Sequence, residues 1–454
     1  MAKSQQGTST SDRTILLGVF VAWKAFLLAI ALGSSTTPSY DTSTSLALNL
    51  PPDHVAAAAA SSASLLPPSP SLTDIIAARL TRWDAIYFTQ SANRGYVFEQ
   101  EWAFGAGLPF LVSRVVLPLA SRLGLGPHGQ LTVKSAALAA IAVSHLSHLL
   151  TVFLLYSLVR RLLPGRGNLA LTTSLLHVLS PAGLFLSAPY AESLFACLSF
   201  AGYLVYVSSE GGSAVRHGLG LIISGALLGL ATTCRTNGIL NGIIFVVELL
   251  ATLHVFARSP RLTNAFTVTS TIVGGVLVGL GSVAPQIVAY LRYCSEASGD
   301  GGLKRPWCTK LVPSIYDFVQ EQYWNCGFLR YWTLGNLPLF LLALPMLGLM
   351  LTSSYTTIVP MIPSVITDLR STTPSTRLLL SLSVGQGLLA LLAFTNYHVQ
   401  VITRLASAYP IWYIWVARSL QSKSRSSPPR NIVMYMVLYA SVQGVLFASF
   451  LPPA

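Results

Sequence analysis

The sequence predicts an all-α protein that crosses a membrane many times. Of its 454 residues, 52% are hydrophobic and only 9% are charged, whereas about a quarter of the residues in a soluble domain carry a charge. The mean hydropathy of +0.61 supports the same class. Apolar runs of about 20 residues, the length that spans a bilayer, recur along the chain.

We expect about eleven such transmembrane helices. In order, they cover residues 14–33, 136–158, 169–187, 190–207, 218–234, 238–257, 266–291, 335–352, 377–395, 400–418 and 431–450. The first run is similar to a signal peptide. However, Lys24 interrupts it, and no small-residue cleavage site followed by a soluble domain is evident, so we expect a retained anchor.

Basic residues in the short loops set the expected orientation. They fall on alternate loops, which places them all on one side of the membrane: Lys3, Arg13, Arg160, Arg161, Arg166, Arg216, Arg258, Arg261, Arg418, Lys423, Arg425 and Arg430. Cytoplasmic loops carry such an excess, so the N-terminus is expected in the cytoplasm. The long loops 34–135 and 292–334 then face the lumen or the exterior.

The net charge of +13 is scattered over these loops rather than gathered on one face. We therefore expect no nucleic-acid partner, and favour anionic lipid head groups and phosphate-bearing lipid substrates.

The chain divides into segments by composition. Residues 1–33 form the cytoplasmic N-terminus and first span, 34–72 a disordered low-complexity luminal insertion rich in Ser, Thr, Ala and Pro, 73–135 a luminal catalytic loop with interfacial helices, 136–291 spans two to seven, 292–334 a second luminal loop, and 335–454 spans eight to eleven.

Helical order is expected to begin at Thr73, because Ile76, Leu80, Trp83 and Tyr87 recur at helical spacing. This amphipathic helix would lie on the luminal surface of the membrane, with Asp84 on its flank.

Residues 108–123 are apolar but contain Pro109, Arg114 and Pro118, so we expect an interfacial or re-entrant segment there.

Cysteines give one further expectation. Cys294, Cys308 and Cys326 share the second luminal loop, which allows one disulfide and one free thiol, with the pairing left open. Cys197 and Cys234 are expected to be packed thiols.

Polar and aromatic clusters fall at luminal helix ends or in luminal loops, which favours an enzyme with a luminal active site. A transporter would place ionisable residues near mid-bilayer, where only Lys24 and Glu248 are evident. We expect these two to form a buried ion pair between two helices; a proton or ion path is the weaker interpretation.

Seven motifs, in order, resemble one family. They stand at Trp83–Phe88, Phe98–Phe104, Ser180–Ala182, Glu192–Ala196, Arg235–Gly238, Arg305–Cys308 and Tyr323–Trp332. They resemble the GPI mannosyltransferase 2 family, of the PIG-V type, and cover most of the chain after residue 73.

The resemblance implies a GT-C type glycosyltransferase of the endoplasmic reticulum. It would take mannose from dolichol-phosphate mannose and add the second mannose, α1,6-linked, to a GPI-anchor precursor with inversion at the anomeric carbon. It also leaves room for a small accessory membrane subunit.

Such a displacement needs a base for the acceptor hydroxyl and positive charge for the departing phosphate. We assign Asp84 as the base, against the alternative of a helix cap or an ion pair with Arg79 or Arg82. Glu99 is the second carboxylate: it shares the base role, binds sugar hydroxyls, or is a solvated loop residue.

Phosphate binding is assigned first to Arg235 and Arg404 and second to Arg305 and Arg330, since a guanidinium holds two phosphate oxygens at once. The alternative for Arg235 and Arg404 is an ion pair with a luminal carboxylate or with a lipid phosphate. His398 and Gln400 are candidates for sugar hydroxyls or helix anchoring, and Glu192 complements a helix N-terminus. The remaining candidate substrate-binding residues are Arg82, Trp83, Trp102, Asn237, Trp324 and Asn325.

No metal-binding or nucleotide-binding motif is present, and no protein cofactor is expected; a divalent ion shared by Asp84 and Glu99 stays open. One alternative is another dolichol-phosphate-sugar transferase of the same fold, acting on N-glycan precursors or protein hydroxyls. A lipid scramblase or transporter is the alternative from another class.

Overall fold

The computed structural model describes residues 2–34, 40–50, 70–124, 132–295, 305–369, 372–422 and 428–452, and within them the only regular elements are helices. Helical segments long and apolar enough to cross a membrane are Thr10–Gly33, Val133–Leu162, Ala214–Cys234, Thr236–Arg258, Leu262–Tyr293, Leu334–Val365, Pro374–Thr395 and Pro429–Ala448. The chain is therefore an all-helical, multi-pass membrane protein, with eight candidate spans in its described part.

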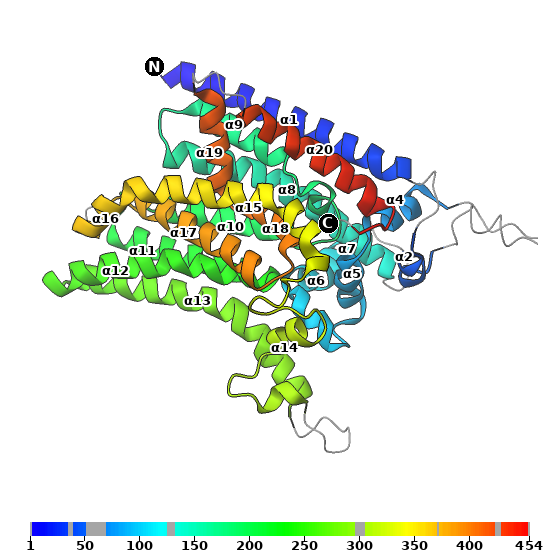
Figure 1. The fold of residues 1–454 in the computed structure, drawn as a ribbon. Coiled ribbons are helices and arrows are strands. Elements are labelled where there is room, and N and C mark those ends of the chain that lie inside the picture. Colours follow the sequence, from blue (N-terminus) through cyan, green and yellow to red (C-terminus); the bar gives the residue numbers. More distant parts are fainter. Residues whose placement is uncertain are drawn as a thin grey trace, which may run out of the picture.

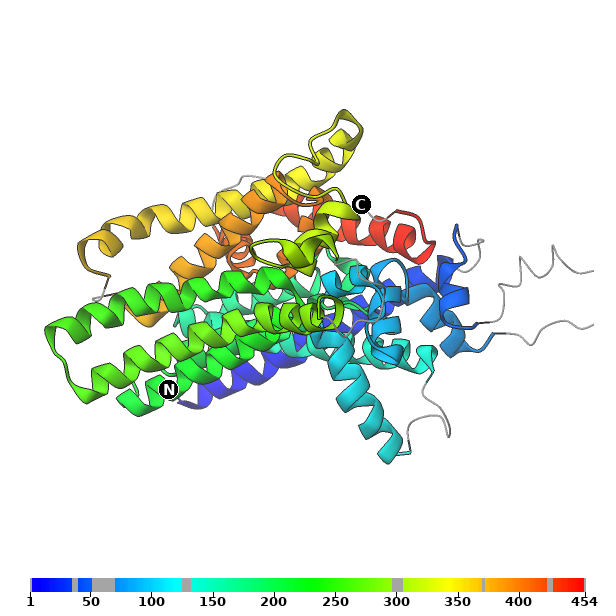
Figure 2. The same cartoon turned by 90° about the horizontal axis from the view of Figure 1, so that it is seen from below.

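The long helices run side by side in a bundle (Figures 1 and 2). They are α1 (Ala2–Gly33), α8 (Val133–Leu162), α11 (Ala214–Cys234), α12 (Gly242–Arg258), α13 (Leu262–Tyr293), α15 (Leu337–Ile358), α17 (Pro374–Thr395) and α20 (Pro428–Ala448). Short helices η8 (Val359–Met361) and α16 (Ile362–Asp368) extend α15.

Three of the eleven expected spans contain shorter helices. They are α9 (Gly167–Val178), α10 (Glu192–Ser208) and α19 (Pro410–Gln421). Prolines explain the breaks: Pro181 and Pro189 lie between α9 and α10, and Pro410 starts α19. Residues 180–191, which lie between α9 and α10 and include the short 3-10 helix η4 (Gly183–Leu186), are buried, so this break in the α-helices is shielded from lipid.

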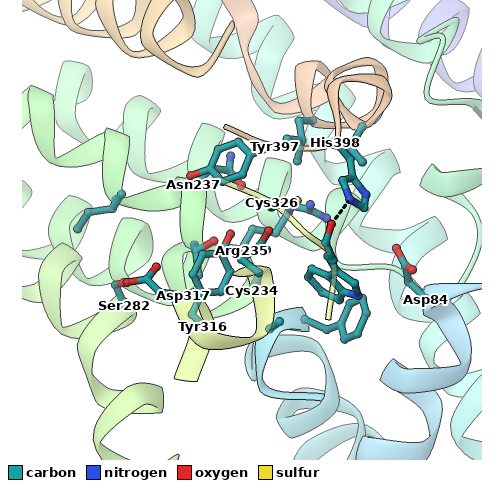
Figure 3. A pocket seen from close by; sticks show the side chains of 18 of the residues that line it. Asp84, Cys234, Arg235, Asn237, Ser282, Tyr316, Asp317, Cys326, Tyr397 and His398 are labelled. Atoms are coloured by element: carbon teal, nitrogen blue, oxygen red, sulfur yellow. Dashed lines mark hydrogen bonds between the residues drawn. The ribbon is translucent and has the colours of Figure 1, made fainter. Parts of the chain in front are cut away.

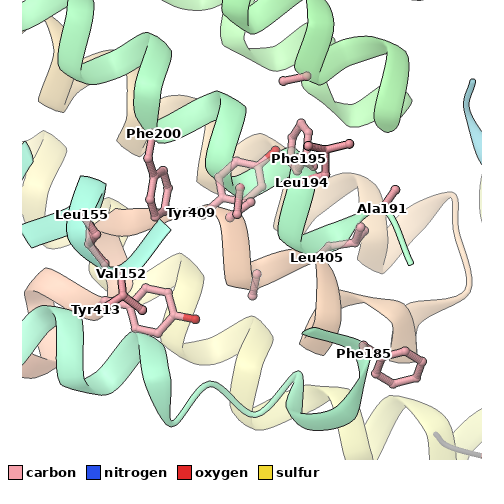
Figure 4. Packing of buried hydrophobic residues seen from close by; sticks show 14 of the residues in the cluster. Val152, Leu155, Phe185, Ala191, Leu194, Phe195, Phe200, Leu405, Tyr409 and Tyr413 are labelled. Carbon is pink, nitrogen blue, oxygen red and sulfur yellow. The ribbon is translucent and has the colours of Figure 1, made fainter. Parts of the chain in front are cut away.

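The core is formed around α10. Its rings pack against α8 and the segment before α19, as Figure 4 shows for Phe195, Phe200 and Tyr409. Phe200 and Tyr413 also contact the buried ring of His177 on α9. Aromatic packing, rather than helix length, thus stabilises the short internal helices.

Short helices gather at one end of the bundle, where α2 (Ser43–Ala47), α4 (Leu72–Leu80), α5 (Asp84–Arg94) and α14 (Ile315–Gln322) lie opposite the N-terminus and α16 (Figure 1). The same end holds η2 (Glu99–Phe104), α6 (Gly107–Leu111), η3 (Val112–Val116), α7 (Leu117–Arg122), η5 (Thr236–Asn241), η6 (Pro306–Thr309), η7 (Leu334–Asn336), η10 (Val399–Val401), α18 (Ile402–Leu405) and η11 (Ala406–Ala408).

The expected single helix after Thr73 is wrong. Ser71 caps α4 through a hydrogen bond from the Asp74 amide, but α4 ends at Leu80. A new helix, α5, starts at Asp84, because Trp83 has a positive φ of 56° that no α-helix accommodates. Asp84 therefore occupies the first turn of a helix instead of the flank of a continuous one.

Part of the expected disordered insertion is ordered. Within residues 40–50, the Thr44 hydroxyl donates to the Thr81 carbonyl at 2.7 Å, and the Gln90 side chain donates to the Ala47 carbonyl at 3.0 Å. The expectation of disorder is thus wrong for residues 40–50, where side-chain bonds replace apolar periodicity. Residues 35–39 and 51–69 lie outside the described residues.

The segment from Gly107 to Arg122 is helical, with one π-helical turn at Val112–Val116, and it is not among the candidate spans. It exposes Phe110, Val115 and Leu119. Its interfacial or re-entrant position stays a prediction.

The expected pairing of Lys24 with Glu248 is wrong. Lys24 on α1 donates instead to the Leu186 carbonyl at 2.9 Å and to the Ser187 hydroxyl at 2.7 Å. Glu248 on α12 pairs with Arg377 of α17, with Nε and a carboxylate oxygen 2.8 Å apart. Lys24 and Glu248 therefore bind different segments of the bundle.

Glu248 organises a buried group that joins four helices. Besides Arg377, it accepts a hydrogen bond from Tyr206 on α10, and His217 on α11 lies 3.5 Å away. We call Glu248, Arg377, Tyr206 and His217 the core cluster.

The segment between α13 and α15 contains the disulfide Cys294–Cys308, which ties the end of α13 to η6. Cys326 is a free, buried thiol, and so is Cys234, while Cys197 is free and partly buried. The expectation of one bridge and one free thiol in this loop is confirmed.

Candidate active site

A cavity of about 1110 Å³ opens among the short helices. Its walls come from α5, η2, η5, the last turns of α13, the start of α14 and residues 397–405. These segments are distant in sequence, and the fold brings them to one end of the bundle (Figure 3). Of the predicted site residues, those lining the cavity are Trp83, Asp84, Arg235, Asn237, Trp324, His398, Gln400 and Arg404.

Asp84 reaches the cavity from the first turn of α5. Negative charge is favoured at a helix N-terminus, where backbone N–H groups lack partners inside the helix. Its side chain is 29% exposed, so a substrate hydroxyl can reach it. Tyr87, one turn on, stacks on Phe104 with ring centroids 4.7 Å apart and forms the neighbouring wall.

Asp84 is held by an arginine. A guanidinium nitrogen of Arg404 lies 2.9 Å from its carboxylate. The expected alternative partners, Arg79 and Arg82, are buried and contact the C-terminal region: Arg79 donates to the Ala448 carbonyl at 3.5 Å, and the Arg82 guanidinium lies over the Phe450 ring. Because the guanidinium fixes the carboxylate, Asp84 faces the cavity in a defined orientation.

Arg404 also connects Asp84 to a second acidic residue. Its Nε lies 3.5 Å from Glu192 Oε1, and the same oxygen accepts a hydrogen bond from Arg235 at 2.6 Å. We call Asp84, Arg404, Glu192 and Arg235 the site chain. Opposite charges alternate along it, so each arginine is stabilised in an otherwise apolar environment.

Aromatic rings support the site chain. The Arg404 guanidinium lies over the rings of Phe185 and Tyr190, at 5.2 and 5.4 Å from their centroids. Such contacts favour a desolvated cation. Glu192, at the first position of α10, is itself buried and does not line the cavity.

The remaining lining residues are oriented by hydrogen bonds. Asn237 donates to the Tyr409 hydroxyl at 3.1 Å, and His398 Nε2 lies 3.0 Å from the Trp324 carbonyl. Gln400 accepts from the Tyr331 hydroxyl at 3.3 Å. These side chains have fixed positions around the cavity, as sugar recognition requires.

Glu99 lies elsewhere. Its carboxylate accepts a hydrogen bond from Trp307 Nε1 at 3.0 Å and sits 3.8 Å from Arg305. Trp102 and Trp307 are buried in the same small core, which joins η2 to the segment between α13 and α15. This position supports a role for Glu99 in holding that loop, and none of these residues lines the cavity.

Two further predicted residues also stand apart from the cavity. Arg330 pairs with the exposed Glu321 at 2.9 Å. Asn325 has a positive φ of 49°, which suits an asparagine in a turn.

No group of three His, Cys, Asp or Glu side chains in the described part of the chain is arranged to hold a metal ion. Asp84 pairs with Arg404 and Glu99 with Trp307, so the arrangement lends no support to an ion shared by the two carboxylates.

Asp317, Tyr316 and Tyr397 line the cavity, although they were not among the predicted site residues. The sequence does indicate that a helix begins near Asp317, because Ser314, three residues before it, is a typical N-cap residue and caps α14 in the structure.

Solved structures give only a distant match. The apo oligosaccharyltransferase of Archaeoglobus fulgidus is similar with a TM-score of 0.40 and 13% identity, over 84% of this chain and 56% of that one. The chain thus spans little more than half the length of that protein, and the likeness is too weak to support an inference.

Sequence comparison is decisive. The family model described as mannosyltransferase (PIG-V) matches residues 15–454. GPI mannosyltransferase 2 of Gibberella zeae is 44% identical over 97% of both chains, and that of Chaetomium globosum is 45% identical over 97% of this chain and 96% of its own. The family predicted from the seven motifs is confirmed, and the chain belongs to the PIG-V mannosyltransferase family.

Proposed function

We propose that the chain transfers the second mannose, α1,6-linked, from dolichol-phosphate mannose to a GPI-anchor precursor. Family membership supports a mannosyltransferase with a GPI acceptor. The observation that carries the assignment of chemistry is Asp84, held by Arg404 at the wall of a cavity large enough for sugar groups.

The reaction is a single displacement that inverts the anomeric carbon. Asp84 accepts the proton of the acceptor 6-hydroxyl as its oxygen attacks that carbon, while the bond to the donor phosphate breaks. General base catalysis of this kind contributes about 10²- to 10⁴-fold to a rate. The attacking oxygen must therefore come within hydrogen-bond distance of Asp84.

Arg404 and Arg235 supply positive charge for the leaving phosphate. Both line the cavity, and both are already held by carboxylates. Arg235 Nε has no hydrogen-bond partner among the described residues, so this guanidinium retains a donor beyond those that Glu192 engages. A guanidinium stabilises two phosphate oxygens at once, which offsets the charge that develops on departure.

The topology proposed here is that of a GT-C transferase with eleven passes. Besides the eight candidate spans, this topology requires one further pass in each of three regions: α9 with η4, α10, and α18 with α19. With the arginine-rich loops in the cytoplasm, the cavity faces the lumen of the endoplasmic reticulum. An accessory membrane subunit stays a prediction.

A transporter would need Lys24 or Glu248 to be free to bind an ion or a proton, but both residues are engaged in internal contacts. Lys24 donates to Leu186 and Ser187, and Glu248 belongs to the core cluster. The enzyme is therefore the better-supported function.

The test is transfer in membranes that lack the endogenous second GPI mannosyltransferase. Supplying the intact chain should convert the one-mannose intermediate into the two-mannose intermediate, identified by mass spectrometry and linkage analysis. No conversion at normal expression would contradict the proposed acceptor. Mannose transfer to an N-glycan precursor or a protein in the same membranes would instead identify the alternative transferase.

A further inference from the structure

We propose that residues 104–107, which we call the strap, position the base Asp84 relative to Arg235. The inference rests on the proposed function and adds Gly105 and Gly107 to it as positioning residues. Neither glycine has a side chain that could take part in the chemistry. Both therefore act through the two segments that the strap brings together.

One end of the strap is joined to the helix that carries the base. Phe104 begins the strap and lines the cavity. Its ring stacks on Tyr87 with centroids 4.7 Å apart and meets Phe88 edge-on at 5.8 Å. Tyr87 and Phe88 lie on α5, one turn after Asp84. The position of the strap therefore sets the position of the first turn of α5.

The other end of the strap lies against the last residues of α11, directly before Arg235. The Ala106 amide donates to the Thr233 carbonyl at 2.8 Å. A Cβ atom added at Gly105 would overlap the Cys234 carbonyl oxygen and lie 2.9 Å from the Thr233 carbonyl oxygen. Only a residue without a side chain allows two backbones to approach this closely.

Gly107 makes a second close contact with the same helix end. A Cβ atom added there would overlap the Cys234 sulfur and lie 2.8 Å from the Thr233 hydroxyl. Cys234 is buried and lines the cavity next to Arg235 (Figure 3). The nearest atoms to Gly107 thus belong to side chains, whereas those nearest to Gly105 belong to the backbone.

The strap is fixed from behind. The Tyr96 hydroxyl donates to the Gly105 carbonyl at 2.6 Å. The buried carboxylate of Glu101 accepts from the Phe98 amide at 3.0 Å and pairs with Arg94 at 2.6 Å. The loop that precedes the strap is therefore rigid, and a displaced strap moves together with its neighbours.

The end of α11 is equally fixed. At Gly225 and Gly229, α11 lies so close to α13 that an added Cβ atom would overlap the backbone of α13. A new side chain in the strap therefore widens the separation between α5 and the end of α11, and with it that between Asp84 and Arg235. A misplacement of about 1 Å costs up to about 100-fold in rate.

Backbone conformation alone does not account for Gly105. Gly95 has the same positive φ of 79°. A Cβ atom added at Gly95, however, would meet no heavy atom within 4 Å among the described residues beyond its chain neighbours. Gly95→Ala thus imposes backbone strain of the same kind without a contact to α11, which makes it the matched control.

The experiment measures kcat and KM for mannose transfer, per folded molecule, in Gly105→Ala, Gly107→Ala and Gly95→Ala. Gly105→Ala should lower kcat about 100-fold. Both KM values should stay near those of the intact enzyme, because the groups that bind the substrates remain. Gly107→Ala should cause a smaller loss of kcat, since side chains yield more readily than backbone. Gly95→Ala should lower the unfolding temperature but keep kcat near the intact value.

Cys234→Ala supplies the second test, because it removes the sulfur that the new methyl group of Gly107→Ala would meet. In the Cys234→Ala background, Gly107→Ala should recover about threefold or more in kcat, as expected for two residues in contact. Gly105→Ala should gain nothing from Cys234→Ala, because its contacts are with the backbone.

Full kcat in both Gly105→Ala and Gly107→Ala overturns the inference. It is also overturned if Gly95→Ala loses as much kcat as Gly105→Ala, or if Cys234→Ala does not reduce the loss in Gly107→Ala. Should Gly105→Ala fail to fold, the comparison of Gly107→Ala with and without Cys234→Ala decides. No transfer by the intact chain rejects the proposed function and this inference with it.

Discussion

The site chain and the core cluster are built from the same chemistry but differ in what surrounds them. In both, arginine and glutamate from different helices pair at about 3 Å. The Asp84 side chain is 29% exposed, whereas that of Glu248 is 1% exposed. A buried ion pair is thus no sign of catalysis by itself; access from a cavity separates the two groups.

This comparison assigns different roles to the two groups. The core cluster joins α10, α11, α12 and α17 within the membrane, where an unpaired charge is expensive. The site chain joins α5, η5, α10 and α18 around a cavity, and its charges can be shared with a substrate. Substitutions in the first should change stability, and substitutions in the second should change transfer.

The largest effect is expected for Asp84→Asn. The amide keeps the size of the side chain but cannot take a proton, so kcat should fall by about 10²- to 10⁴-fold. Transfer to a saturating acceptor measures this change, and a thermal unfolding scan in detergent is the control. Full activity of Asp84→Asn would place the base at another residue.

Glu248→Gln should act mainly on stability. It leaves Arg377 buried without its counter-charge, and removal of one partner of a buried pair costs about 3–5 kcal/mol. The unfolding temperature in detergent should drop clearly. Activity per folded molecule should stay near that of the intact chain, and a selective loss of transfer would break the comparison.

Arg404→Lys tests the site chain from its basic side. Lysine keeps the charge but lacks the planar fork that contacts Asp84 and Glu192 together. We expect kcat/KM to fall about 10- to 100-fold, as for the loss of one charge-assisted hydrogen bond. An unchanged kcat/KM for the dolichol-linked donor would argue against phosphate binding by Arg404.

The double variant Glu248→Met with Arg377→Met should give the smallest effect. Removing both charges avoids leaving one of them buried alone, so it should recover about 1–2 kcal/mol of the stability lost in Glu248→Gln. Recovery will be incomplete, because Tyr206 and His217 lose their partner. Unfolding temperatures of the two variants, measured side by side, check this order.

The sequence predicted the fold class and the end of the molecule that holds the site. Composition alone identified a multi-pass helical protein. The motifs identified Asp84, and the expected helix ends identified Arg235 and Arg404; the structure brings all three to one cavity. The fold class depends on local hydropathy, and the end that holds the site depends on which loops alternate across the membrane. Both follow from the order of residues along the chain.

Contacts between distant segments could not be predicted in this way. Hydropathy gives the depth of Lys24 and Glu248 but not which neighbours each helix faces, so their pairing was wrong. Glu99 follows the Asp84 motif closely in sequence, yet Trp307 from another loop holds it. Asp317 was missed because it lies between the motifs Arg305–Cys308 and Tyr323–Trp332 and belongs to neither.

The most direct test of this account is the transfer rate per folded molecule of Asp84→Asn and Glu248→Gln, prepared and assayed together. We expect Asp84→Asn to unfold like the intact chain but to lose transfer at least about 100-fold. We expect Glu248→Gln to unfold at a lower temperature and to transfer at nearly the intact rate. The opposite pattern, with transfer retained in Asp84→Asn and lost in folded Glu248→Gln, would contradict the assignment of the active site.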